Sequence, residues 1–292
     1  MFSALTLATA MILSAAADPQ YDAAVGKWRK DREARLRADD GWLTVAGLFW
    51  LKTGANRFGT NPSNEIVLPA GSAPATAGSF EFDGSRTFLQ VQGAAPVTLN
   101  GKPATSAEIR PDASGSPDVV RIGDLSMFVI QRAGRYGIRL RDKNSERRRS
   151  FTGLRWFPVK TAYRVTARYV PYTPPKKIPI INVLGDVQDM VSPGYVAFTL
   201  NGTKYQLDPV VEGPGTTELF FILKDQTSGV ETYPAGRFLY TDLPKNGEVV
   251  LDFNKAVSPP CAFTPFATCP LPPKQNQLPI RIEAGERSSE HR

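Results

Sequence analysis

From residue 41 onward, short apolar runs separated by Gly, Pro and Asn-Gly fill the chain. Examples are "LTVAGLFWL" (43–51), "TFLQVQG" (87–93) and "SMFVIQR" (126–132). Runs of this length with turns about every 8–12 residues are typical of antiparallel strands in a sandwich or barrel. Three Asn-Gly pairs predict tight hairpin turns, because Asn and Gly tolerate positive φ angles; these pairs are Asn100-Gly101, Asn201-Gly202 and Asn246-Gly247. We therefore expect an all-β protein.

The strand pattern is interrupted once, by the charge-rich stretch "DKNSERRRSFTG" (142–153), and a second strand series follows it. This predicts two sandwich-like or barrel-like units, a β domain over 41–150 and a C-terminal β domain over 151–292 with a Pro-rich, Cys-containing tail. One short amphipathic helix is expected before them, over 18–40, because apolar side chains recur there at near-helical spacing among charges. These side chains are Tyr21, Val25, Trp28 and Leu36, and Gly41 would end the helix.

The first seventeen residues carry no charge and end in the A-x-A form at Ala15–Ala17. This pattern predicts a secretory signal peptide over 1–17, cleaved before Asp18, although the usual early Lys or Arg is missing. We expect export to the periplasm; the protein would be cytoplasmic if so atypical a signal does not function. No segment approaches the roughly 20 apolar residues of a membrane-spanning helix, so no transmembrane segment is expected.

The formal net charge is +7, and eight basic residues lie between Arg132 and Arg149. Such a stretch could attract phosphate, anionic glycans or lipid head groups. The alternation in "YGIRLRD" favours a plainer interpretation, a solvated strand face, with Ile138 and Leu140 inward and Arg139 and Arg141 outward. Nucleic acid is not expected as a partner of an exported protein.

The only histidine is His291, beside the C-terminus. Ser-His-Asp and Cys-His nucleophile systems and imidazole-ligated metals are therefore disfavoured. No Gly-rich phosphate loop is present either. We expect no cofactor and no metal.

Chemistry-bearing residues gather in "DQTSGVETYPAGRFLYTDLP" (225–244) and on the next expected strand. Carboxylates near an arginine and tyrosines could bind an acidic or sugar ligand, or could hydrolyse glycosides without histidine through Glu231 and Asp252 with Arg237. An arginine within an apolar strand is more often paired with a carboxylate for structural reasons. The candidate ligand-binding residues are Arg237, Glu231, Tyr233, Tyr240, Asp252 and Asn254; catalytic residues are not assigned.

Both cysteines, Cys261 and Cys269, lie in the Pro-rich "NKAVSPPCAFTPFATCPLPP" (254–273). They do not form a C-x-x-C motif, and two thiolates without histidine do not complete a zinc site. In an exported chain a disulfide is the expectation. It would stabilise the fold by roughly 2–3 kcal/mol on the chain-entropy account. A free buried pair is the alternative in a cytosolic protein.

The stretch "GANRFGTNPSNEIVLP" (54–69), with "LNG" at 99–101, resembles the first strands and a turn of forkhead-associated (FHA) domains. In that family an arginine follows the glycine and helps to hold phosphothreonine, whereas here Thr60 follows Gly59. The family's histidine is absent as well. The resemblance implies an FHA-like β sandwich in the N-terminal half without the phosphothreonine-binding pair.

The mature chain as a whole is similar to the family of unknown function DUF1684. The segments that carry the resemblance are 40–69, 153–172, 225–244 and 251–286. The resemblance implies relationship but no activity. We therefore expect an exported binding or structural protein of the cell envelope rather than an enzyme, with the histidine-independent hydrolase as the alternative and an envelope scaffold as a weaker third.

Overall fold

The structure is a computed structural model that describes residues 18–213 and 215–288. The predicted signal peptide (1–17) and His291 lie outside the described residues. Within the described ranges, no helix combines the length and the apolar character needed to cross a membrane.

The described chain begins with helix α1 (Pro19–Arg37). Asp18 caps it, since its carboxylate accepts hydrogen bonds from the backbone N–H groups of Gln20 and Tyr21 at 3.1 Å. Arg35 and Arg37 in the last turn favour the negative end of the helix dipole. Val25 and Leu36 are its buried apolar side chains. The predicted N-terminal helix is confirmed.

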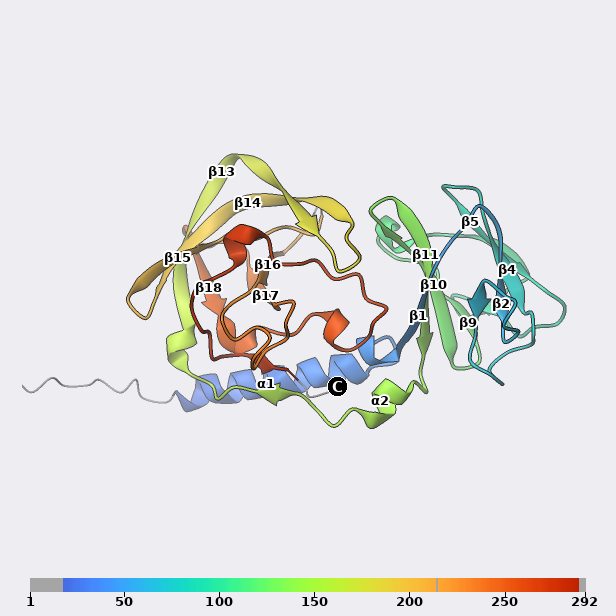
Figure 1. Ribbon diagram of the computed structural model, residues 1–292, viewed down its shortest axis with the longest axis horizontal. Helices are drawn as coiled ribbons and strands as arrows, with labels where there is room; N and C mark the ends of the chain where they lie inside the picture. The colour runs from blue at the N-terminus through green and yellow to red at the C-terminus, as the bar shows by residue number, and fades with distance from the viewer. Residues whose placement is uncertain (1–17, 214, 289–292) are drawn as a thin grey trace, which may run out of the picture.

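Two sheets form the N-terminal unit, a name used here for strands β1–β11 (Figure 1). The first sheet runs in the order β1 (Val45–Trp50), β11 (Arg135–Asp142), β10 (Leu125–Arg132), β9 (Val120–Ile122), β6 (Thr98–Leu99), β7 (Lys102–Pro103). The second runs β3 (Ile66–Val67), β2 (Gly54–Gly59), β4 (Gly78–Phe82), β5 (Thr87–Val91), β8 (Ser106–Ile109). Phe58, Phe80 and Leu89 of the second sheet share one buried apolar cluster with Ile138 and Leu140 of β11.

A short helix, α2 (Glu146–Ser150), follows the N-terminal unit. The C-terminal unit, strands β12–β19, has a four-stranded sheet in the order β15 (Thr203–Leu207), β14 (Val187–Leu200), β13 (Arg164–Ile181), β18 (Glu248–Asp252). Two strand pairs complete it, β16 (Glu218–Leu223) with β17 (Arg237–Asp242), and β12 (Arg155–Trp156) with β19 (Glu286–Arg287). Its main apolar cluster joins side chains of the four-stranded sheet to Leu219, Phe221, Leu223 and Leu239.

The three Asn-Gly turns are confirmed. Each asparagine and each following glycine has a positive φ, for example 50° and 82° at Asn100 and Gly101. The turn between β10 and β11 places Ala133 in the same left-handed region, with φ 47°. The all-β fold class with one N-terminal helix is confirmed too, since strands form most of the regular structure after α1.

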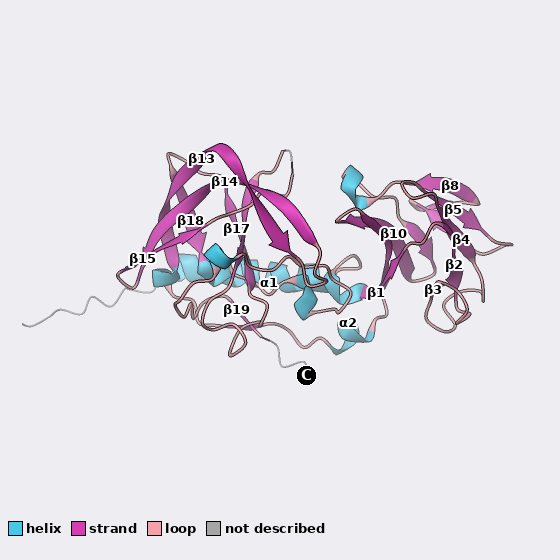
Figure 2. Cartoon of the chain, turned by 45° about the horizontal axis from the view of Figure 1, so that its top comes forward, coloured by secondary structure: helices cyan, strands magenta, loops and turns pink. Residues whose placement is uncertain are grey.

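Helix α1 precedes the N-terminal unit in sequence but packs on the C-terminal unit, beneath its strands in Figure 1. Arg29 and Arg32 of the helix donate hydrogen bonds at 3.0 Å to the carbonyls of Phe157 and Ser258. Tyr21 donates to Asp252 at 2.7 Å. As Figures 1 and 2 show, β10 and β11 are the part of the N-terminal unit that faces the C-terminal unit. The division of the chain near residue 150 stays a prediction.

Candidate functional site

Arg237, the centre of the sequence-predicted cluster, is 1% exposed. Its guanidinium donates to the carboxylate of Asp225 and to the carbonyls of Ala284 and Ile282. Asp225 is buried as well, and it also accepts from the backbone N–H and the hydroxyl of Thr227 at 2.6 and 2.5 Å. Arg237 therefore fastens the 282–284 segment and the 225–227 turn to β17, in the structural pairing that the sequence favoured.

The carboxylates nominated as partners of Arg237 lie elsewhere. Glu231 pairs with Arg281 at 2.5 Å. Asp252 accepts a hydrogen bond from Tyr21 and lies 3.6 Å from the Lys255 ammonium. The structure does not bring Glu231, Asp252 and Arg237 together as one constellation.

Asn254 and Asp252 form the end of β18 and the turn after it. The Asn254 side chain is completely buried, accepts from the backbone N–H of Lys160 at 3.0 Å and donates to the carbonyl of the same residue at 2.9 Å. It also donates to the Tyr21 hydroxyl at 3.0 Å. Burial, followed by the hydrogen bond to Asp252, raises the pKa of Tyr21. This network ties α1 to the C-terminal unit.

The two nominated tyrosines differ in their surroundings. Tyr233 donates to the carbonyl of Cys261 at 3.1 Å and so supports the cysteine segment. Tyr240 is 41% exposed and stacks on Phe220, with ring centroids 4.7 Å apart and planes 5° apart. Of the two, Tyr240 is the one that faces open space.

Cys261 and Cys269 are free thiols in the structure, and they are neighbours. The backbone N–H of Cys261 donates to Sγ of Cys269 at 3.1 Å. A hydrogen bond from the Cys269 thiol lowers the pKa of Cys261 to about 7, and the same contact raises the pKa of Cys269. The predicted disulfide stays a prediction, with both sulfurs placed side by side.

The polar loop residues of the FHA-like segment form local turns. Asn61 accepts from the backbone N–H of Ser63, and Asn64 donates to the carbonyl of Ala75. Asn100 donates to Asp118 and accepts from the N–H of Val119. The hydrogen-bonding groups of these side chains are thus used within the N-terminal unit. This agrees with the absence of the Arg and His that hold phosphothreonine in FHA domains.

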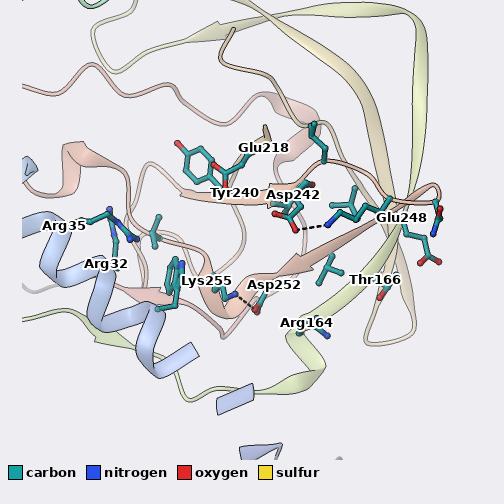
Figure 3. Close-up of a pocket in the computed structure, with 18 residues that line it drawn as sticks. Arg32, Arg35, Arg164, Thr166, Glu218, Tyr240, Asp242, Glu248, Asp252 and Lys255 are labelled. Atoms are coloured by element: carbon teal, nitrogen blue, oxygen red, sulfur yellow. Dashed lines mark hydrogen bonds and ion pairs between the residues drawn. The ribbon is translucent and has the colours of Figure 1, made fainter. Parts of the chain in front are cut away.

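An outer cleft of about 930 Å³ lies between α1 and strands β13, β17 and β18 (Figure 3). Asp252 and Tyr240 line it, with basic residues of α1 facing them. Its charged lining residues are Arg32, Arg35, Arg164, Lys245, Lys255, Glu218, Asp242, Glu248 and Asp252. Figure 3 shows two of the acids bound to neighbouring lysines, Asp242 to Lys245 and Asp252 to Lys255. The outer cleft is wide and has both signs of charge.

An inter-unit cleft of about 660 Å³ lies between the N-terminal unit and the C-terminal unit. One wall comes from the turn and strands of β10–β11, and the other from β13–β14, β16–β17 and the cysteine segment. Arg32, Tyr240 and Val257 line both clefts. Its aromatic and charged lining residues are Trp42, Phe220, Phe238, Tyr240, Arg32, Arg132, Arg139, Asp112, Asp186 and Glu212.

Arg139 is the unusual residue of the inter-unit cleft. It is 4% exposed, and it forms no hydrogen bond or ion pair anywhere in the described part of the chain; its Nε and one terminal nitrogen are fully buried without a partner. The guanidinium lies 5.0 Å from the Trp42 ring centroid. Burial lowers the pKa of Arg139 to about 10, and Arg132 adds to the effect by repulsion.

The predicted solvated face of "YGIRLRD" is therefore wrong at Arg139. Ile138 and Leu140 point into the core as expected, but the opposite face of β11 is covered by the C-terminal unit. Alternation along a strand gives the two faces but not what covers the outer one.

Three other basic residues near Arg139 have partners, whereas the buried Nε of Arg141, two positions along β11, has none. Arg132 pairs with Asp112 at 2.7 Å, and Arg135 pairs with Asp186 of the C-terminal unit. Arg32 donates to the Ser258 carbonyl and lies 3.6 Å from Glu286. Arg139 is thus a buried cation at the wall of a cavity without a direct ion pair, and the acid whose charge acts on it, Asp112, is already paired with Arg132.

Within residues 18–213 and 215–288, no group of three His, Cys, Asp or Glu side chains lies together in a way that could hold a metal ion. The inter-unit cleft is lined by basic, acidic and aromatic side chains.

Comparison with known proteins gives a family. A model described as "Protein of unknown function (DUF1684)" matches residues 149–287. The segment 149–287 therefore belongs to the DUF1684 family. No curated protein matches it.

Among solved structures, the DUF1684 chain is similar to an uncharacterized protein of Haloarcula marismortui solved in solution. The two are 30% identical, with a TM-score of 0.42, over 50% of this chain and 81% of that one. The FhaA FHA domain, solved in complex with an intracellular domain, is 18% identical, with a TM-score of 0.24, over 32% and 97%. A further FHA domain, from a study of phosphothreonine-dependent interactions, is 18% identical, with a TM-score of 0.24, over 32% of this chain and 92% of that one.

The DUF1684 match has a bearing on how the cleft is built. It includes Arg237, both cysteines and the C-terminal wall of the inter-unit cleft, but it begins only after Trp42 and Arg139. The wall with the unpaired cation thus comes from outside the matched segment.

Proposed function

We propose that this DUF1684 protein is an exported binding protein of the cell envelope that holds a small anionic ligand in the inter-unit cleft. The observation that carries the proposal is Arg139, a buried guanidinium at the cleft wall that forms no ion pair or hydrogen bond with the described residues. A buried charge is costly unless it is paired and hydrogen-bonded, so a bound carboxylate or phosphate would relieve the cost.

The electrostatics support an anion at this place. A pKa of about 10 leaves Arg139 charged at neutral pH. The directly opposite neighbours of Arg139 on the flanking strands are Leu48 and Phe128, which offer no hydrogen-bond acceptor from their side chains. A guanidinium binds carboxylate and phosphate in a bidentate geometry, and the interaction strengthens where water is excluded.

The size and lining of the cleft fit a small molecule. Its volume of about 660 Å³ falls within the roughly 300–1,000 Å³ of ligand sites. Trp42, Phe220 and Tyr240 supply apolar faces on which a ligand body can pack. Of the ligand residues proposed from sequence, Tyr240 belongs to this cleft, while Arg237 and Asn254 are absorbed by structural contacts.

The test is thermal unfolding of the full chain with acetate, N-acetyl-alanine and inorganic phosphate. We expect at least one of these anions to raise the melting temperature of the wild type but not of Arg139→Met. Arg121→Met is the matched control, because Arg121 is an exposed arginine of the same sheet that does not line the cleft. Equal stabilisation of all three proteins would contradict the proposal.

Export rests on the sequence of residues 1–17. Intact mass of protein from the envelope fraction, with and without reduction and thiol alkylation, tests it. The expected result is loss of residues 1–17 and no alkylation before reduction. An unprocessed N-terminus with two reactive thiols would contradict both export and the disulfide.

A histidine-independent hydrolase is the second candidate. One observation favours it, since Asp252 lines the outer cleft, which has room for a sugar substrate, together with Glu218, Asp242 and Glu248. Glu231 does not line that cleft, so the carboxylate partner would have to be one of these three. Turnover of p-nitrophenyl glycosides by the wild type and its loss in Glu248→Gln would support this candidate; absence of turnover by the wild type would remove it.

A further inference from the structure

The inter-unit cleft has a negative pole as well as a positive one. Glu212, on the connection between β15 and β16, lines both this cleft and an adjoining cavity of about 210 Å³. Glu218, the first residue of β16, lines the same adjoining cavity. Among the described residues neither carboxylate forms an ion pair, so two unpaired acids face shared space.

The two acids influence each other. Desolvation by neighbouring groups raises the pKa of Glu212, although the residue as a whole is exposed, and the Glu218 carboxylate raises it further by repulsion. Arg132 opposes this shift but is already paired with Asp112. A cation bound between Glu212 and Glu218 would remove the repulsion, in the way that an anion would relieve Arg139.

An aromatic wall lies beside the acids. Tyr240 lines the inter-unit cleft and the adjoining cavity, and its ring is stacked on Phe220 on one side and 41% exposed. An ammonium group placed at an exposed aromatic face is attracted by the electrons of the ring. Acids and an aromatic face together are the usual components of a site for an organic cation.

Both poles belong to one cavity. Arg139 and Glu212 line the same cleft of about 660 Å³. The charge of Arg132 affects the pKa of both residues, so both lie near Arg132. A simple anion would meet Arg139 but leave the acids unpaired. A simple cation would leave Arg139 unpaired.

Resting on the proposed function, we infer that the ligand is a zwitterion, a short peptide or amino acid whose carboxylate binds Arg139 and whose ammonium binds Glu212 beside Glu218 and Tyr240. Backbone amides of such a ligand match the polar lining residues Gln131 and Gln188. The apolar lining residues accept its side chains.

Isothermal titration of the full chain with three probes tests the inference: tri-alanine, N-acetyl-tri-alanine without the ammonium, and tri-alanine amide without the carboxylate. We expect tri-alanine to bind about tenfold more tightly than either blocked peptide, a ratio that corresponds to about 1.4 kcal/mol. Glu212→Gln should lose the preference for the free amine yet bind N-acetyl-tri-alanine as the wild type does. Glu248→Gln, an acid of the outer cleft alone, is the matched control.

The outcomes separate the two claims. If N-acetyl-tri-alanine binds as tightly as tri-alanine and only Arg139→Met weakens it, the zwitterion inference is overturned while the anion site stands. If tri-alanine amide binds as tightly as tri-alanine and Arg139→Met has no effect, or if no probe binds, the proposed function fails together with the inference.

Discussion

The C-terminal unit around Arg237 and the inter-unit cleft around Arg139 each contain an arginine that is nearly inaccessible to water, 1% and 4% exposed. Arg237 has a carboxylate and two carbonyl acceptors, whereas Arg139 has none. The charge of Arg237 is thus neutralised within the fold, although its buried Nε has no hydrogen-bond partner. Burial alone therefore does not distinguish a ligand-binding arginine from a structural one; the absence of an ion pair does.

The largest expected loss of stability follows from replacing Arg237. Replacing it with Met leaves Asp225 as a buried carboxylate without its cation, which typically costs about 3–5 kcal/mol. We expect the free energy of unfolding, measured in urea, to fall by that amount. The double variant Arg237→Met with Asp225→Asn should recover part of the loss, because no charge is then left unpaired. An unchanged free energy of unfolding in the single variant would break the comparison.

The cysteine pair gives the next largest effect, and it lies at the C-terminal wall of the inter-unit cleft through Cys269. If the pair is oxidised, its reduction should lower the free energy of unfolding by about 2–3 kcal/mol on the chain-entropy account. The measurement is urea unfolding with and without a reductant, and Cys261→Ser should show no reductant effect. A wild type insensitive to the reductant would contradict the disulfide.

Asp118 offers an intermediate case, a buried carboxylate paired with the mostly exposed Arg110 at 2.9 Å. The hydrogen bond from Arg110 lowers the pKa of Asp118 to about 2. Because the folded pKa is below the unfolded value of about 3.9, the stabilisation is present above pH 4 and is lost as the pH falls toward 2. Asp118→Asn should lose about 1–2 kcal/mol at pH 7, with allowance for solvent screening.

The check on Asp118 is urea unfolding at several pH values between 7 and 2. The difference between the wild type and Asp118→Asn should shrink across the acid range as the wild-type carboxylate takes up its proton. A difference that stays constant with pH would show that the lost stability has another origin.

The smallest expected effect on stability is at Arg139. Met has the length to fill the space and removes an unpaired buried charge, so we expect no loss beyond about 0.5 kcal/mol. Urea unfolding of Arg139→Met beside Arg237→Met gives the contrast directly. A loss of 3 kcal/mol or more at Arg139 would mean that the residue is structural, and the comparison would fail.

Much of the fold could be predicted from the sequence. Apolar alternation, the Asn-Gly turns and the near-helical spacing of apolar residues over 18–40 are local signals, and each has its structural counterpart. The packing of α1 on the C-terminal unit could not be predicted, because the partners of Arg29 and Arg32 lie more than 120 residues away in sequence.

The site was less accessible to sequence reasoning. The segment 225–244 suggests a ligand site because its charged and aromatic residues are close in sequence. In the structure, however, Arg237, Glu231 and Tyr233 each have separate structural partners. The alternation along the strand predicts a solvated face for Arg139, because no local pattern shows that a second unit covers this face. Its one local signal was its position within a strongly apolar strand pair, opposite Leu48 and Phe128.

The most direct test of the central claim is isothermal titration of N-acetyl-tri-alanine into the wild type, Arg139→Met and Arg121→Met. The account predicts equal affinity for the wild type and Arg121→Met, and a loss of about tenfold or more in Arg139→Met, equivalent to at least about 1.4 kcal/mol. Equal affinity in all three proteins would show that Arg139 does not hold an anion in the inter-unit cleft.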